Sequence, residues 1–162
     1  MKKVLNIISV VVITVVVYSF MSEDSVPATA KPLNERVAAS VEKAIGSKTN
    51  MGEKRIIGLG IDQGNIAIMR LHGDDNFTDN LTIKSIWIQT KEVLPAIFEN
   101  SDVQKAVIEW NLGFVDDYGK VSVKPVMQLA FTRQTVEKIE FDTVPFDSIP
   151  KIADEYKQTW RP

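Results

Sequence analysis

The catalytic chemistry open to this chain is limited by its histidine and cysteine content. The sequence holds one histidine, His72, and no cysteine. A serine–histidine triad needs a histidine beside its nucleophile, and no G-x-S-x-G motif is present. The H-E-x-x-H zinc motif needs two histidines, and thiolate metal sites and disulfides need cysteine. We interpret His72 as an exposed histidine at the end of a strand. The sequence therefore predicts no catalytic, cofactor-binding or metal-ligating residue.

Residues 74–80, DDNFTDN, have the oxygen-rich composition that calcium prefers. Oxygen-bearing side chains occupy the first, third and fifth positions, as they do in an EF-hand loop. The sixth position is Asp79, where that loop needs glycine, and the twelfth is Ser85, where it needs a bidentate glutamate. We therefore predict a polar loop that caps the next helix, with a weaker calcium site as the alternative.

Two other motifs have simpler explanations than catalysis. The glycines of residues 58–64 lack the G-x-G-x-x-G spacing of a dinucleotide-binding loop, and a strand follows them where that loop needs a helix. Asp116 and Asp117 are adjacent in a predicted turn, where neither carboxylate is desolvated for acid–base work. We expect this turn, which also contains Tyr118, to be a hairpin tip, with a role as an exposed contact as the alternative.

The three tryptophans do not form a recognisable ligand platform. Trp87 and Trp110 lie on apolar faces and are predicted to be core residues, whereas Trp160 either packs back onto the domain or stays free for a partner. Asn76 and Asn80 begin glycosylation sequons, which matter only in a eukaryotic secretory pathway.

The charge is nearly balanced, with 19 basic and 21 acidic residues and a net charge of −2. Residues 1–30 hold two of each sign, so the remainder keeps 17 basic and 19 acidic residues and the same net charge. The lysines and arginines are scattered among acids and form no basic stripe. We therefore expect no nucleic-acid partner. No bound cofactor is expected either, because no nucleotide-binding or metal-binding motif is present.

Residues 4–21 form an uncharged, largely apolar run behind Lys2 and Lys3. As a helix, 18 residues span roughly 27 Å at about 1.5 Å per residue, enough for a thin hydrocarbon core. A helix is expected because an unpaired strand leaves its backbone groups unsatisfied in lipid. The basic start and the acids at 23 and 24 place the N-terminus inside and the rest outside.

The segment after this run leaves its fate open. Ala28-Thr29-Ala30 has the small-x-small form accepted by signal peptidase, which would cleave before Lys31. The prediction is therefore a transmembrane anchor or a signal peptide over residues 1–21, a linker over 22–32, and an extracytoplasmic domain over 33–162. We expect the protein at the plasma membrane, single-pass with its N-terminus inside and the domain outside, or secreted after cleavage near Ala30.

The domain itself reads as two hairpins separated by helices. A helix over 33–45 is followed by strands over 54–61 and 65–72, a helix over 80–100 that Pro95 kinks or restarts, and strands over 108–114 and 121–131. Short helices are expected over 132–139 and 148–158. The fold class is α+β: a small antiparallel sheet of about four strands (two hairpins) with helices packed on one face, preceded by an N-terminal hydrophobic helix.

Function is predicted from export combined with the lack of a catalytic motif. The first hypothesis is a membrane-anchored or secreted extracytoplasmic, non-enzymatic domain that contacts the membrane through its N-terminal segment and binds a protein or envelope partner. The alternative is a secreted hydrolase with a carboxylate-based site.

Overall fold

The computed structural model describes residues 31–160. The predicted anchor or signal peptide over 1–21 and nearly all of the linker 22–32 lie outside the described residues. None of the helices within the described range is long and apolar enough to cross a membrane.

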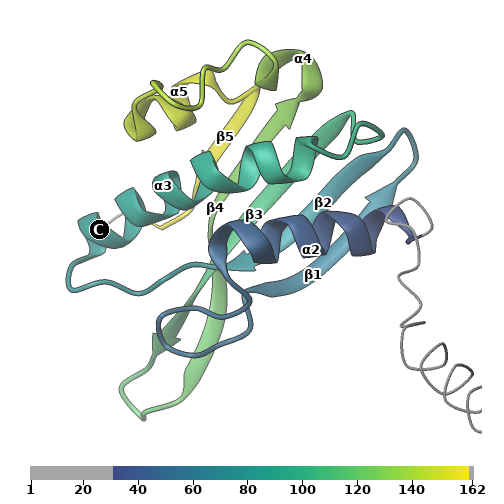
Figure 1. Cartoon of the computed structure of the whole chain (residues 1–162). Coiled ribbons are helices and arrows are strands. Elements are labelled where there is room, and N and C mark those ends of the chain that lie inside the picture. The colour runs from purple at the N-terminus through teal and green to yellow at the C-terminus, as the bar shows by residue number, and fades with distance from the viewer. Residues whose placement is uncertain (1–30, 161–162) are drawn as a thin grey trace, which may run out of the picture. The chain divides into compact units, whose positions relative to one another are not determined.

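The described residues form an α+β domain (Figure 1). Its helices and strands follow in this order: α2 (Leu33–Ile45), β1 (Ile56–Asp62), β2 (Ile66–His72), α3 (Asp79–Phe98), β3 (Lys105–Val115), β4 (Val121–Thr132), α4 (Arg133–Val136), the 3-10 turn η2 (Phe146–Ser148), α5 (Ile149–Ile152) and β5 (Glu155–Gln158).

The sheet has five strands in the order β1-β2-β3-β4-β5 and is mixed. The two predicted hairpins, β1–β2 and β3–β4, are antiparallel and are confirmed. The expectation of a fully antiparallel sheet of about four strands is wrong, because β2 and β3 pair in parallel and β5 adds a fifth strand. Since α3 returns the chain to the starting end of β2 before β3 begins, the two hairpins join in parallel.

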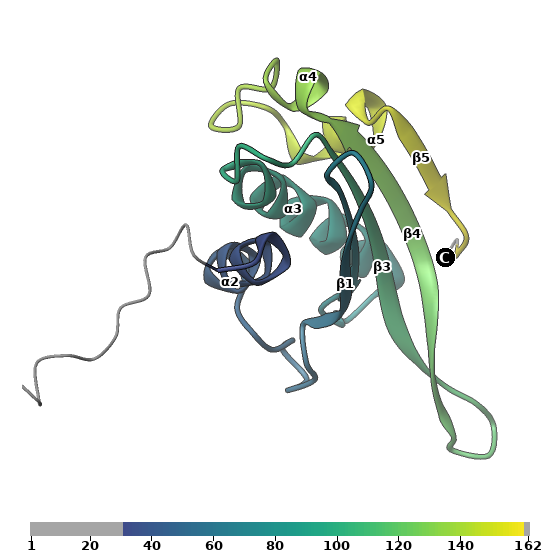
Figure 2. The same ribbon diagram turned by 90° about the vertical axis from the view of Figure 1, so that its right-hand side faces the viewer.

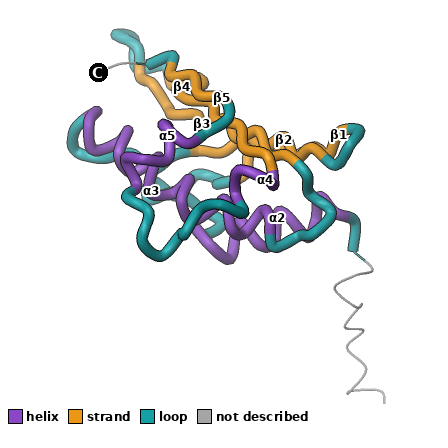
Figure 3. Tube along the Cα trace, turned by 90° about the horizontal axis from the view of Figure 1, so that it is seen from above, coloured by secondary structure: helices purple, strands orange, loops and turns teal. Residues whose placement is uncertain are grey.

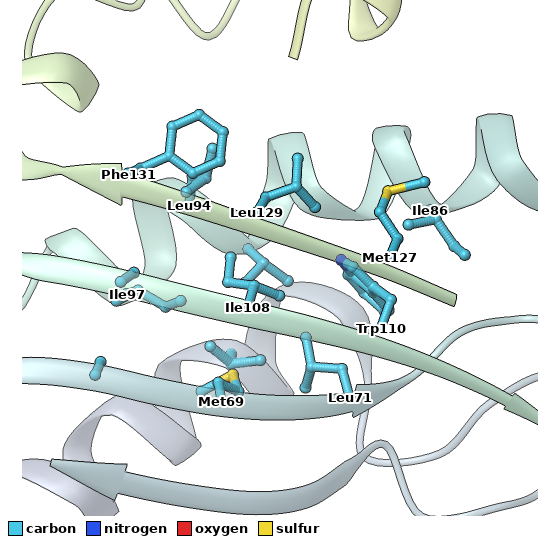
Figure 4. Close-up of a cluster of buried hydrophobic side chains, with 14 of the residues drawn as sticks. Met69, Leu71, Ile86, Leu94, Ile97, Ile108, Trp110, Met127, Leu129 and Phe131 are labelled. Carbon is cyan, nitrogen blue, oxygen red and sulfur yellow. The ribbon is translucent and has the colours of Figure 1, made fainter. Parts of the chain in front are cut away.

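Helices α2 and α3 lie on the same face of the sheet (Figures 2 and 3). Between them and the strands is a continuous apolar core, part of which appears in Figure 4. Trp110 is fully buried at its centre and donates from Nε1 to Thr90 Oγ1 at 2.9 Å. The prediction that Trp110 is a core residue is confirmed, whereas Trp87, predicted to be a core residue as well, is only partly buried and packs against the core.

Local signals fix the ends of the two longer helices. Gly46 ends α2 with a φ of 80°, in the left-handed region that glycine adopts without strain. Thr78 begins α3, and its side chain accepts a hydrogen bond from the backbone N–H of Leu81 at 3.3 Å. Of the predicted kink or restart at Pro95, the restart is wrong, because α3 continues through that residue.

The C-terminal segment differs most from its prediction. Residues 148–158 form only a short helix, α5, before β5 pairs with the free edge of β4. Asp154 holds the corner between them, accepting hydrogen bonds from Thr135 Oγ1 and from the backbone N–H of Thr132, both at 2.6 Å. Partial desolvation opposes ionisation of Asp154, but these hydrogen bonds, together with the Lys105 charge, lower its pKa below the usual 3.8. As a strand, residues 155–158 pair with β4 through backbone hydrogen bonds.

Candidate binding groove

The β3–β4 hairpin extends past the other strands (Figure 2). A groove with a cavity volume of about 410 Å³ lies against it. Four separate stretches of chain form it: the loop before β1, the β2–α3 loop with the first residue of α3, the hairpin, and the second residue after β5. Its lining residues are Met51, Glu53, Gly73, Asp75, Asp79, Leu112, Gly113, Phe114, Val115, Val121 and Trp160. We call this the hairpin groove.

Apolar side chains form much of the hairpin groove. Met51, Val115 and Val121 are 70%, 69% and 65% exposed, which is high for large apolar residues. Phe114 and Trp160 are half-buried and meet edge to face, with ring centroids 5.7 Å apart and an interplanar angle of 77°. The structure thus places Trp160 against the domain, where it forms part of the groove.

The charged residues of the hairpin groove are all acidic. Glu53, Asp75 and Asp79 line it, and no lysine, arginine or histidine is among the lining residues. The carboxylates of Asp75 and Asp79 have no hydrogen-bond or ion-pair partner within residues 31–160. Lys124 lines a neighbouring depression, and its Nζ lies 5.6 Å from the centroid of the Phe114 ring.

A buried ion pair holds the two loops of the groove together. Arg55, whose side chain is 3% exposed, places Nη2 2.8 Å from Asp74 Oδ1. The guanidinium also donates to the backbone oxygens of His72 and Lys48, at 2.8 and 3.1 Å. Asp74 accepts a further hydrogen bond from the backbone N–H of Asn50 at 2.8 Å.

Gln89 on α3 completes this network by donating from Nε2 to Asp74 Oδ2. Asn50 and Asp75 add two hydrogen bonds between the loops, at 2.5 and 3.1 Å. The loops that carry Met51 and Asp75 are therefore fixed to each other and to α3, which favours a groove formed before any ligand arrives.

Close packing beneath the groove depends on Gly73. A methyl group added there would lie 3.1 Å from Leu112 Cδ2 and 3.3 Å from Ile86 Cγ1. The backbone N–H of Gly73 donates to the oxygen of Asn111 at 2.9 Å. A glycine at this position lets the β2–α3 loop lie directly against the hairpin.

The structure corrects the interpretation of His72. It is half-buried instead of exposed, with its side chain 12% accessible. Its Nδ1 lies 3.2 Å from the backbone oxygen of Lys54 and 3.6 Å from Glu53 Oε2. Within the described range its Nε2 is buried and has no hydrogen-bond partner. His72 therefore lies beside the groove residue Glu53 and is not itself among the lining residues.

The polar loop at residues 74–80 caps α3 through Thr78, as predicted. Asp74, the first residue of the considered calcium loop, is committed to Arg55. In the part of the chain that the structure describes, no cluster of three or more histidine or acidic side chains is arranged to hold a metal ion.

The predicted hairpin tip is a well-formed turn. Asp116 Oδ1 accepts hydrogen bonds from the backbone N–H groups of Tyr118 and Lys120, at 2.9 and 2.8 Å. Gly119 has a φ of 78°, which suits its place in the turn. Tyr118 is 91% exposed at this tip, next to the groove residues Val115 and Val121.

Comparison with known proteins does not assign the chain to a family: no family model, no curated protein and no solved structure matches it.

Proposed function

We propose that this chain is a non-enzymatic binding protein that acts outside the cytoplasm and contacts a protein or envelope partner through the hairpin groove. Residues 1–21 hold it at the plasma membrane, or cleavage near Ala30 releases it. The observation that carries the proposal is the groove itself, whose lining combines exposed apolar side chains with the unpaired carboxylates of Asp75 and Asp79. Contiguous exposed apolar surface with a polar rim is typical of interaction sites.

Site-specific crosslinking in the source cells tests this proposal. A photoreactive amino acid replaces Met51 or Val121 in the groove, and, in matched controls, Ile68 on β2 or Ile88 on α3, which are 44% and 42% exposed. We expect one dominant partner at both groove positions and not at the control positions. Equal adducts at all four positions, or none at any, would contradict a docking site in the groove.

The predicted location needs its own measurement. Membrane fractionation followed by N-terminal sequencing separates the two forms: an anchored protein stays in the membrane with Met1 or Lys2 first, and a released protein begins at Lys31. Full-length protein recovered from the cytosol would contradict both.

A secreted hydrolase with a carboxylate-based site is the second proposal. It is supported by the convergence of Glu53, Asp75 and Asp79 on one groove. Screening of glycoside and peptide substrates tests it. Turnover that is lost in Asp75→Asn or Asp79→Asn, and kept in the exposed-site control Asp142→Asn, would favour this proposal over simple binding.

A further inference from the structure

The hairpin groove is selective in its charge and in its apolar surface. We propose that it binds an extended peptide segment in which an aromatic or large aliphatic side chain is flanked by lysine or arginine. The inference rests on the proposed function, since it names the chemistry of the partner that the groove would take.

The basic character follows from the charges that line the groove. Its three carboxylates stand without a lining cation, and those of Asp75 and Asp79 have no partner in the described part of the chain. An acidic segment would add like charge to this surface, whereas lysine or arginine would pair with it. The residues are exposed, so these pairs act mainly in selection and in the rate of encounter.

The apolar character follows from the residues that line the groove together with the carboxylates. The edge-to-face pair of Phe114 and Trp160 offers aromatic surface, and edge or face contacts with a third ring are favourable. Met51, which is 70% exposed, is unbranched and adapts its shape to the group that it meets.

The size of the groove favours a segment of chain over a folded surface. A volume of about 410 Å³ lies in the lower part of the range of ligand sites, roughly 300–1,000 Å³. A segment of chain can place one large side chain against the Phe114–Trp160 pair while its flanking positions lie near the carboxylates that line the same groove.

Titration of three short peptides against the full-length protein in non-ionic detergent micelles tests the inference. KKFKK carries both features, EEFEE keeps the aromatic ring and reverses the charge, and KKSKK keeps the charge and removes the ring. Tryptophan fluorescence reports binding at the groove through Trp160, and calorimetry gives an independent affinity. We expect KKFKK to bind at least tenfold more tightly than either of the others.

Variants locate the binding site. Asp75→Asn/Asp79→Asn should weaken KKFKK binding about tenfold at low salt, since each exposed pair contributes up to about fivefold, and added salt should reduce this difference. The control Glu92→Gln/Asp142→Asn removes two exposed acids outside the groove and should leave affinity unchanged. Trp160→Phe should keep binding by calorimetry and lose most of the fluorescence change.

Each result separates this inference from the proposed function. Equal affinity for KKFKK and EEFEE, or equal losses in the two double variants, would overturn the inferred partner chemistry. If groove crosslinking still captures one partner in that case, the proposed function stands and the inference fails. If KKFKK binds as expected but groove crosslinking finds no partner in cells, the proposed function fails and the chemical preference stands.

Discussion

Replacing Asp74 by asparagine should destabilise the domain strongly, because it leaves the Arg55 guanidinium without a charged partner. The Arg55 side chain is 3% exposed, and its Nη2 lies 2.8 Å from Asp74 Oδ1. Removing one partner of a buried ion pair costs about 3–5 kcal/mol. Since the Asp74 side chain is 23% exposed and asparagine keeps one acceptor oxygen, we expect a loss of about 2–4 kcal/mol in the free energy of unfolding.

Thermal and urea unfolding of the wild type and Asp74→Asn measure this loss. For a domain of this size, such a change lowers the melting temperature on the order of 10 °C. The matched control is Glu155→Gln, which breaks the Lys105–Glu155 pair. That pair has the same 2.8 Å separation, but its side chains are 30% and 71% exposed. We expect its loss to cost less than about 1 kcal/mol.

The comparison can refute the reasoning directly. Similar small losses in Asp74→Asn and Glu155→Gln would show that burial does not strengthen the dependence of Arg55 on its partner. A double variant, Arg55→Met/Asp74→Asn, should be more stable than Asp74→Asn alone, because no buried charge remains. Faster hydrogen exchange at the Asn50 amide in Asp74→Asn would show that the loop beside the groove loosens as well.

Three further predictions concern single residues. Because hydrogen bonds lower the pKa of Asp154, its contribution to stability is present above about pH 3.8 and is lost as the pH falls through the folded-state pKa. The melting temperature of Asp154→Asn should therefore fall less than that of the wild type between pH 5 and pH 2. Gly73→Ala should lower the free energy of unfolding by about 1–3 kcal/mol, because the added methyl group would crowd Leu112 and Ile86. At Gly60 an added methyl group would have no atom within 4 Å, so Gly60→Ala should be nearly neutral in chemical unfolding. Equal effects of the two changes would contradict the close packing at Gly73. Thr90→Val should cost about 1–3 kcal/mol by leaving the buried N–H of Trp110 unpaired, and an unchanged melting temperature would contradict that role.

The parts of the fold that depend on neighbouring residues could be predicted from the sequence. The hairpin β1–β2 follows from the glycine-containing turn at residues 62–64, and Gly64 has a φ of 81° there. β1 has a register shift between Ile56 and Gly58, and a glycine inside a strand is a local signal of such an irregularity. Thr78 caps α3 as its position suggests.

The parts that depend on distant residues could not be predicted. Parallel pairing of β2 with β3 is set by how α3 packs across the sheet, and no local pattern records it. Residues 155–158 become a strand because β4 presents an unpaired edge to them and Asp154 fixes the corner. The helical pattern read over 148–158 was overridden by this tertiary pairing.

The hairpin groove was equally hidden from the sequence, because four separated segments assemble it. The acidic loop around Asp75 and the aromatic residue Trp160 are each conspicuous in the sequence, but no sequence pattern indicates that they line one groove. No sequence motif marks Met51 or Glu53 as a site residue. Their place in the groove depends on the buried Arg55, which ties their loop to Asp74.

The exposure of the groove carboxylates makes binding the less demanding of the two proposed functions. Hydrolysis with two carboxyl groups needs one of them desolvated, so that it stays protonated, while the other stays ionised. Glu53, Asp75 and Asp79 are all exposed, so the free domain gives none of them the burial that an acid catalyst uses. Binding asks only that these charges meet a partner of opposite sign. A hydrolase would in addition need its substrate to cover one carboxylate and leave another in water, so that the first takes up a proton while the second stays ionised. Peptide titration at varied pH would detect this as proton uptake coupled to binding.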